Sequence, residues 1–208
     1  MPKKTDSRIQ KKNQAAILDA GLAVFSQYGF RGSTLDQVAK VAGLSKPNIL
    51  YYFESKDAIY TALLTKLLEN WLEPLRAVRA DGDPIQELLD YATRKLDMSQ
   101  NYPSESRLFA NEIIQGAPQI GDVLRSDLRA LVDEMAVVIN GWAAAGQIKP
   151  VDPYHLIFSI WSVTQHYADF EVQIQAILGD TDPFDGARAH LETLLRGMLT
   201  PESANTVP

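Results

Sequence analysis

The side chains best suited to molecular recognition lie in the segment 45–56. A helix over its first half would gather four of them on one face: Pro47, Asn48, Tyr51 and Tyr52. An asparagine amide can pair with adenine through two hydrogen bonds, and a proline can contact a thymine methyl group. Lys46, at the edge of this face, could reach guanine. The spacing therefore indicates a helix that can read base edges in the major groove of DNA.

The elements that would position this face are two short helices joined by a glycine turn. Thr34-Leu-Asp-Gln37 is a capping-box pattern that predicts a helix start, and Gly43 would end that helix. Ser45 can cap the next helix, with Pro47 in its first turn. These are the dimensions of a helix-turn-helix. The spacing alone also allows a packing hairpin in a helical bundle.

The charge distribution separates the chain into a basic head and an acidic body. Residues 1–60 carry nine Lys or Arg and five Asp or Glu, a net charge of +4. The remainder carries eleven Lys or Arg and 21 Asp or Glu, a net charge of −10. This asymmetry favours a polyanion as the partner of the head, although a basic tail without a partner would give the same pattern.

Residues 11–60 resemble the DNA-binding domain of the TetR family of bacterial one-component regulators. The motifs that carry this resemblance are Ala16-Ile-Leu18, Phe25 with Gly29-Phe30, Gly32-Ser-Thr34, Val38-Ala39, Ala42-Gly-Leu-Ser45 and Ile49 with Tyr52-Phe53 and Ser55-Lys56. One departure is Leu50, which stands where the family usually has a tyrosine. If Leu50 cannot touch a phosphate, Tyr51 and Tyr52 must supply that contact.

The resemblance implies two sets of DNA contacts. The residues expected to face bases are Lys46, Pro47, Asn48 and Tyr51. The residues expected to face phosphates are Thr34, Ser45, Tyr52 and Lys56. The partner would be a palindromic double-stranded operator, because modules of this size bind as symmetric pairs.

The rest of the chain reads as helix, so we expect an all-α fold of about nine helices. Predicted helices after the first four are 85–98, 104–114, 123–145, 153–178 and 187–199. The domains expected are a DNA-binding domain over 1–56, with 1–10 a disordered basic arm, and a ligand-binding and dimerisation domain over 57–200. A disordered tail over 201–208 would follow.

Two features of the second domain indicate a binding site. Trp71 precedes Pro74 in the fourth helix, where a proline removes a hydrogen bond and predicts a kink. Trp161 and Gln165 share one face of an otherwise apolar helix. An amide beside an aromatic ring suits a small, flat, polar heterocycle. Gln165 could instead bond to the backbone, with Trp161 in the core.

The second domain also resembles a member of the TetR family that regulates pyrimidine use and responds to uracil and thymine. The motifs are Trp71-Leu-Glu-Pro-Leu75, Tyr102-Pro with Ser106-Arg-Leu-Phe109, Gly116-Ala-Pro118, Asp152-Pro with His155-Leu-Ile-Phe158, and Ile160-Trp161 with Thr164-Gln-His-Tyr-Ala-Asp-Phe170. The resemblance implies an effector site that includes Trp71, Leu75, Asn111, Glu112, Trp161, Gln165 and His166. A purine, a dihydropyrimidine or a drug-like molecule is the alternative effector.

The last two long helices carry more apolar surface than one core needs. The surplus stripe is Leu156, Val163, Tyr167, Phe170 and Ile174. Family members dimerise through these helices, so the resemblance implies a homodimer; contact with the chain's own helices is the alternative. We therefore expect a ligand-responsive DNA-binding regulator, more specifically a repressor.

Other classes of protein fit the sequence less well. The chain has no cysteine and only three histidines, and we find no metal-binding or phosphate-binding motif, so we expect neither an enzyme nor a metal or cofactor. The polar N-terminus and the lack of a long apolar run indicate a cytoplasmic protein. A helical interaction protein that never touches DNA remains the alternative.

Overall fold

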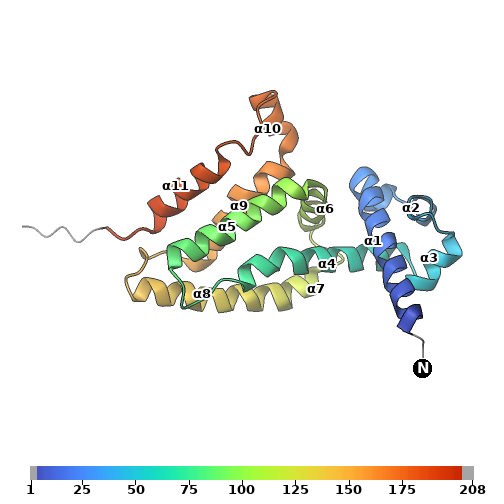
Figure 1. The fold of residues 1–208 in the computed structure, drawn as a ribbon, viewed down its shortest axis with the longest axis horizontal. Coiled ribbons are helices and arrows are strands. Elements are labelled where there is room, and N and C mark those ends of the chain that lie inside the picture. Colours follow the sequence, from blue (N-terminus) through green and yellow to red (C-terminus); the bar gives the residue numbers. More distant parts are fainter. Residues whose placement is uncertain (1–3, 203–208) are drawn as a thin grey trace, which may run out of the picture. The chain divides into compact units, whose positions relative to one another are not determined.

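The part of the chain that the structure describes is helical. The structure is a computed structural model that describes residues 4–202, and every regular element within that range is a helix (Figure 1). This confirms the predicted all-α class. The elements are α1 (Lys4–Gly32), α2 (Leu35–Ala42), α3 (Lys46–Tyr52), α4 (Lys56–Arg76), α5 (Pro84–Asn101), α6 (Pro103–Ile114), α7 (Gly121–Val123), the π-helix η1 (Leu124–Leu128), α8 (Arg129–Ala144), α9 (Pro153–Asp169), α10 (Glu171–Leu178) and α11 (Ala187–Leu199).

The helices form two compact units. The N-terminal unit comprises the chain up to Glu69 together with Arg107–Gly121, and the C-terminal unit comprises Asn70–Ser106 together with the chain from Asp122 on. Helices α4 and α6 each contribute residues to both units. The domain boundary predicted between residues 56 and 57 stays a prediction.

Local sequence signals account for the helix ends in the N-terminal unit. Both hydrogen bonds of the predicted capping box are present between Thr34 and Gln37. Gly43 ends α2 in the left-handed conformation (φ 65°), which costs glycine less than any other residue. Helix α2 packs on α1 and α3. The apolar core beneath them includes Ile17, Val24, Phe25, Val38, Ile49, Ile59 and Leu64.

Helix α1 begins earlier than the sequence predicts. Residues 4–10 belong to α1, where a disordered arm is predicted, and residues 1–3 of that arm lie outside the described range. Residues 8–10 are exposed, and arginine and glutamine are good helix formers, so the helix can continue here without a buried face. At the other end, Gly29 interrupts α1 with a positive φ of 69°.

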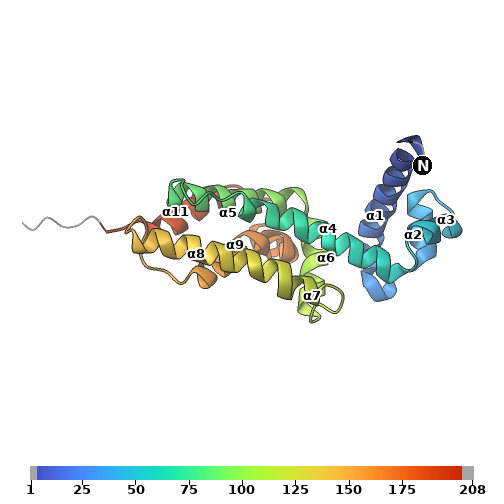
Figure 2. The ribbon, with the colours of Figure 1, turned by 90° about the horizontal axis from the view of Figure 1, so that it is seen from below.

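In the C-terminal unit, α5 packs against α9 and α11, and α9 also packs against α8 (Figure 2). These four helices carry apolar side chains that are almost fully buried. They include Leu88, Ala92, Ile139, Leu156, Ile157, Ile160, Leu195 and Leu199. No helix among residues 4–202 combines the length and the hydrophobicity that a membrane span requires.

The helix predicted over 153–178 is two helices. It breaks at Phe170 (φ −116°, ψ 28°), which separates α9 from α10. No residue of α10 is buried, so the core does not fix its eight residues in line with α9. In contrast, α7, η1 and α8 follow one another without a gap over the helix predicted for 123–145. The predicted tail begins with two non-helical residues, and residues 203–208 lie outside the described range.

Candidate functional site

The exposed face of α3 is held in place by one buried residue and one cap. Ile49 is fully buried, and the Ser45 hydroxyl accepts a hydrogen bond from the Asn48 backbone at 3.4 Å. On the opposite side Tyr51 is 72% exposed, and Pro47 and Asn48 are also exposed. The short helix therefore presents these side chains on a fixed backbone.

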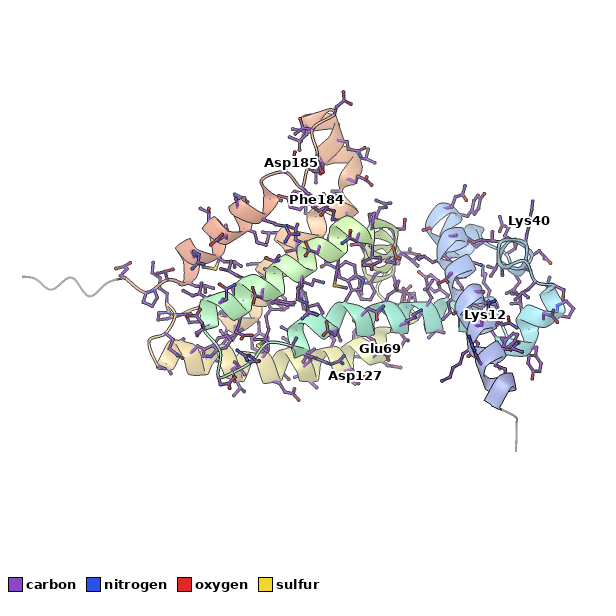
Figure 3. All side chains as sticks on the ribbon, in the orientation of Figure 1. Lys12, Lys40, Glu69, Asp127, Phe184 and Asp185 are labelled. Carbon is purple, nitrogen blue, oxygen red and sulfur yellow. The ribbon has the colours of Figure 1, made fainter. Side chains whose placement is uncertain are left out.

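Lys46 is the cation at the edge of this face. Its ammonium group lies 2.9 Å from the Asp36 carboxylate of α2, and both side chains are exposed. An exposed pair of this kind contributes little to stability, so the lysine can exchange Asp36 for another anion at small cost. Lys12 of α1 and Lys40 of α2, both exposed, are labelled in Figure 3.

Tyr52 lies beside the N-terminal half of α1. The Asn13 side-chain amide donates a hydrogen bond of 2.8 Å to the Tyr52 hydroxyl oxygen, which leaves the hydroxyl proton available for another acceptor. The rings of Tyr51 and Tyr52 meet edge to face, with centroids 5.0 Å apart. A hollow of about 450 Å³ is lined by Gln10, Lys11, Gln14, Tyr51 and Tyr52.

Lys56, Thr34 and Ser45 are engaged within the protein. The Lys56 ammonium donates to the backbone oxygens of Phe30 (2.7 Å) and Ser33 (2.8 Å) and lies 4.3 Å from the centroid of the Phe30 ring. These contacts join the start of α4 to the last turn of α1 and to the residue that follows it. Thr34 and Ser45 are the N-caps of α2 and α3. Leu50, at the position of the family's tyrosine, is 42% exposed.

In the C-terminal unit, Trp71 is buried beneath a lysine. The Lys95 ammonium of α5 lies 4.0 Å from the centroid of the Trp71 ring, and both residues are at most 5% exposed. Burial lowers the pKa of Lys95 to about 7, although the nearby charge of Asp169 acts in the opposite direction. Leu75, one turn further along α4, is 1% exposed.

Trp161 and Gln165 border a hollow on α9. The Trp161 indole N–H donates a hydrogen bond of 2.6 Å to the hydroxyl of the buried Tyr91, and burial raises the pKa of that hydroxyl. The hollow has a volume of about 410 Å³ and is lined by Phe158, Trp161, Ser162, Gln165, His166, Asp169 and Phe170. His166 is exposed and stacks on Phe170 at 4.8 Å between ring centroids.

Asn111 and Glu112 belong to the N-terminal unit, whereas Trp71, Leu75, Trp161, Gln165 and His166 belong to the C-terminal unit. Asn111 is exposed. Glu112 is 3% exposed and accepts a hydrogen bond of 2.7 Å from the Gln119 backbone.

The hydroxyl of Tyr60 is also hydrogen-bonded to Glu112, and burial together with this carboxylate raises the pKa of Tyr60. The Thr61 hydroxyl donates to the Gln119 side chain at 3.1 Å. Glu112 therefore joins α6, α4 and the segment that follows α6 within the N-terminal unit.

Sequence reasoning missed the polar residues around Trp71 and Trp161. They are Tyr91, Lys95, Ser106 and Asp169, and the Ser106 hydroxyl donates a hydrogen bond of 2.6 Å to Asp169. A signal for Lys95 existed, because it falls on the stripe of α5 that carries the buried Leu88 and Ala92. A charged residue on a buried stripe needs a specific partner.

Residues 4–202 contain no cluster of three or more side chains suited to hold a metal ion.

The comparisons with known proteins match both parts of the chain. Residues 17–63 match the family described as bacterial regulatory proteins, tetR family, and residues 64–202 match the C-terminal region of YcdC-like proteins. The chain is a member of the TetR family. It is a DNA-binding transcriptional regulator and not an enzyme, because its matched relatives are regulators.

Two named regulators are among the relatives of this chain. The transcriptional regulator RutR of Escherichia coli K12 is 49% identical over 175 residues, which are 84% of this chain and 82% of RutR. The transcriptional repressor NicS of Pseudomonas putida is 28% identical over 71% of this chain and 70% of NicS. Regulators of this family bind operator DNA and effectors, typically as dimers.

Solved structures show the same fold. A transcriptional regulator of Streptomyces coelicolor, SCO4942, superposes with a TM-score of 0.73 at 24% identity, covering 91% of this chain and 99% of that chain. AibR, solved in complex with isovaleryl coenzyme A and operator DNA, superposes with a TM-score of 0.66 at 16% identity, covering 91% of this chain and all of AibR.

Proposed function

We propose that this chain is a cytoplasmic, homodimeric repressor that binds a palindromic operator through α2 and α3. The observation that supports this best is the exposed face of α3, where Tyr51 is 72% exposed opposite the fully buried Ile49. Base contacts come from Lys46, Pro47 and Asn48 together with Tyr51. Tyr52 and the residues at the helix N-termini, Thr34, Ser45 and Lys56, contact phosphates.

The effector is a free pyrimidine base, uracil or thymine. This rests on the resemblance between the second domain and the pyrimidine-responsive member of the family, and on the chemistry of Trp71, Trp161 and Gln165. Two indole rings offer flat apolar surfaces, and the Gln165 amide offers both a donor and an acceptor. His166, which lines the hollow on α9 with Trp161 and Gln165, is a further candidate contact.

The dimer forms through α9 and α11, the last two long helices. The stripe predicted for this contact needs one correction, because Leu156 is 1% exposed and packs in the chain's own core. Phe170 of this stripe is 51% exposed, and Phe158 of α9 is 46% exposed; both also line the hollow on α9. These exposed aromatic side chains are candidates for contact with a second copy, together with the rest of the stripe.

The effector acts through α4. This helix carries Trp71 near its C-terminal end and begins at Lys56, four residues after α3 ends. It also contains Pro74, which cannot donate a hydrogen bond to the Asn70 carbonyl. A shift of α4 on binding would change the separation of the two recognition helices in the dimer, and successive major grooves require about 34–36 Å.

The DNA-binding claim is tested with duplexes selected from a random library by the wild-type protein. Tyr51→Ala should weaken binding to the selected duplex while the unfolding transition in urea stays unchanged. Lys149→Ala, a lysine of the C-terminal unit, is the matched control and should bind as the wild type does. Failure of the wild type to enrich any duplex would favour an interaction protein without DNA binding.

The effector claim is tested by titration of the intact protein with uracil and thymine, followed by tryptophan fluorescence and calorimetry. Saturable binding that is weakened at least tenfold in Gln165→Ala supports the proposed site. Xanthine and dihydrouracil are included because a purine or a reduced ring is the alternative effector. Saturable binding of xanthine alone would replace the pyrimidine with a purine.

A further inference from the structure

Lys95 is a charged side chain at a position where a core residue is expected. It is 3% exposed, and its ammonium group lies 4.0 Å from the centroid of the Trp71 ring. Burial of an ammonium group is expensive even when an aromatic face compensates part of the cost. A leucine or methionine on the same stripe of α5 would fill the space without that cost. The lysine therefore needs a reason other than packing.

An acceptor for hydrogen bonds lies near this lysine. The charge of Asp169 acts on Lys95, and the Asp169 carboxylate accepts a hydrogen bond of 2.6 Å from Ser106. Asp169 also lines the hollow on α9, together with Trp161 and Gln165. Lys95, Trp71, Trp161 and Asp169 all belong to the C-terminal unit, and Asp169 both acts on the buried Lys95 and lines the hollow.

We propose that Lys95 and Asp169 are effector-contacting residues that select a neutral, planar ring in which a carbonyl oxygen stands next to an N–H, as in a cyclic amide or imide. This inference rests on the proposed effector site and adds the polar contacts that define its ligand class. The ammonium of Lys95 donates to the carbonyl oxygen, and the carboxylate of Asp169 accepts from the adjacent N–H.

Binding requires Lys95 to leave the face of Trp71. The ring of the effector takes the place of the ammonium group against the indole, and the lysine turns to the carbonyl oxygen. Lysine suits this exchange because its four-carbon stem is flexible and its ammonium group can rotate its three donors. In the free protein the Lys95–Trp71 contact fills the space that the effector later occupies.

The hydrogen bond from Lys95 to the carbonyl oxygen makes effector binding sensitive to the protonation of Lys95. Three elements place charged groups around α5: Asp169 of α9 acts on Lys95, while Glu73 of α4 pairs with Arg94 and Arg188 of α11 pairs with Asp97. A pKa of about 7 leaves much of Lys95 neutral at a pH of about 8. A carbonyl acceptor favours the charged form, so binding at that pH takes up a proton.

The experiment is calorimetric titration of the full-length protein with uracil at a pH of about 8, in two buffers that differ in ionisation enthalpy. The wild type is compared with Lys95→Met and Asp169→Asn. Arg94→Met is the matched control, since it makes the same kind of change one residue away on the exposed side of α5. The ligand control is 1,3-dimethyluracil, which keeps both carbonyl groups and has no N–H.

The assignment predicts proton uptake by the wild type and by Arg94→Met, no proton uptake by Lys95→Met, and affinity for uracil at least tenfold weaker in Lys95→Met. Asp169→Asn should also bind more weakly, and the wild type should not bind 1,3-dimethyluracil. Equal affinity of the wild type for uracil and its dimethyl derivative would overturn the assignment, even if a variant failed to fold.

If Lys95→Met took up as many protons and bound uracil as tightly as the wild type, the assignment of Lys95 would also be overturned. The proposed uracil site would stand. If the wild type did not bind uracil at all, both the effector assignment and this inference would fail. DNA binding, measured separately, would be unaffected by that result.

Discussion

The ammonium group of Lys95 lies 4.0 Å from the centroid of the Trp71 ring, inside the C-terminal unit. This contact joins α4 to α5 through two residues that are almost fully buried. It places a cation on the aromatic surface that the sequence predicts for effector binding. The energetics of Lys95 can therefore be tested without any ligand.

The stability of the protein should rise with pH in the weakly alkaline range because of Lys95. Its pKa is about 7 in the folded state and 10.5 for an ordinary lysine, so the unfolded chain binds more protons between these values. A single group of this kind adds up to about 1.4 kcal/mol of stability per pH unit. Urea unfolding at several pH values should show this slope in the wild type and a smaller one in Lys95→Met. Equal slopes would mean that Lys95 is not the group that titrates.

Removal of the Tyr60 hydroxyl should destabilise the protein. Tyr60 is 3% exposed and its hydroxyl is hydrogen-bonded to Glu112, itself 3% exposed. Tyr60→Phe leaves the buried carboxylate with one partner fewer, at a cost of about 1–3 kcal/mol. The free energy of unfolding in urea measures this cost. Tyr28→Phe changes an exposed tyrosine and should leave the free energy of unfolding unchanged. If Tyr60→Phe also left it unchanged, the hydrogen bond from Tyr60 to Glu112 would not stabilise the fold.

The two sides of α3 should respond differently to truncation. Ile49→Ala removes a fully buried side chain and should lower the free energy of unfolding by about 2–5 kcal/mol. Tyr51→Ala removes an exposed ring and should leave stability unchanged while weakening binding to the selected duplex. Urea unfolding and fluorescence anisotropy measure the two effects. A loss of stability in Tyr51→Ala would make this residue part of the fold instead.

A charge on the exposed face of α9 should disrupt the dimer. Phe158 is 46% exposed, and Phe158→Glu would place a carboxylate where a second copy packs. Light scattering coupled to size exclusion should then report a monomer. Val137→Glu, on an exposed position of α8, should remain dimeric. A dimeric Phe158→Glu variant would exclude this face as the interface.

Local signals in the sequence were sufficient for α2 and α3. The capping box at Thr34, the glycine at 43 and the serine cap at 45 act within a few residues, and all three are present in the structure. The extension of α1 over residues 4–10 was not predicted, because residues 8–10 are exposed and no apolar periodicity marks this stretch of the sequence. The break at Phe170 was missed for the opposite reason, since α10 is apolar in sequence although it has no buried residue.

The contacts between distant residues could not be read from the sequence. The Lys95 ammonium meets Trp71 across 24 positions, and the Trp161 indole meets the Tyr91 hydroxyl across 70. Such pairs depend on how α4, α5 and α9 pack, which periodicity alone does not specify. The stripe of α5 contains a signal for the burial of Lys95 that the prediction did not use, and it does not specify which ring the lysine covers.

The most direct test of the central claim is the affinity of the wild-type protein for its selected duplex with and without saturating uracil. Fluorescence anisotropy gives both dissociation constants. An effector that shifts the dimer between two states should weaken DNA binding by about 5–150-fold, the usual range of allosteric coupling. Uracil that binds the protein yet leaves the dissociation constant for the duplex unchanged would contradict the account.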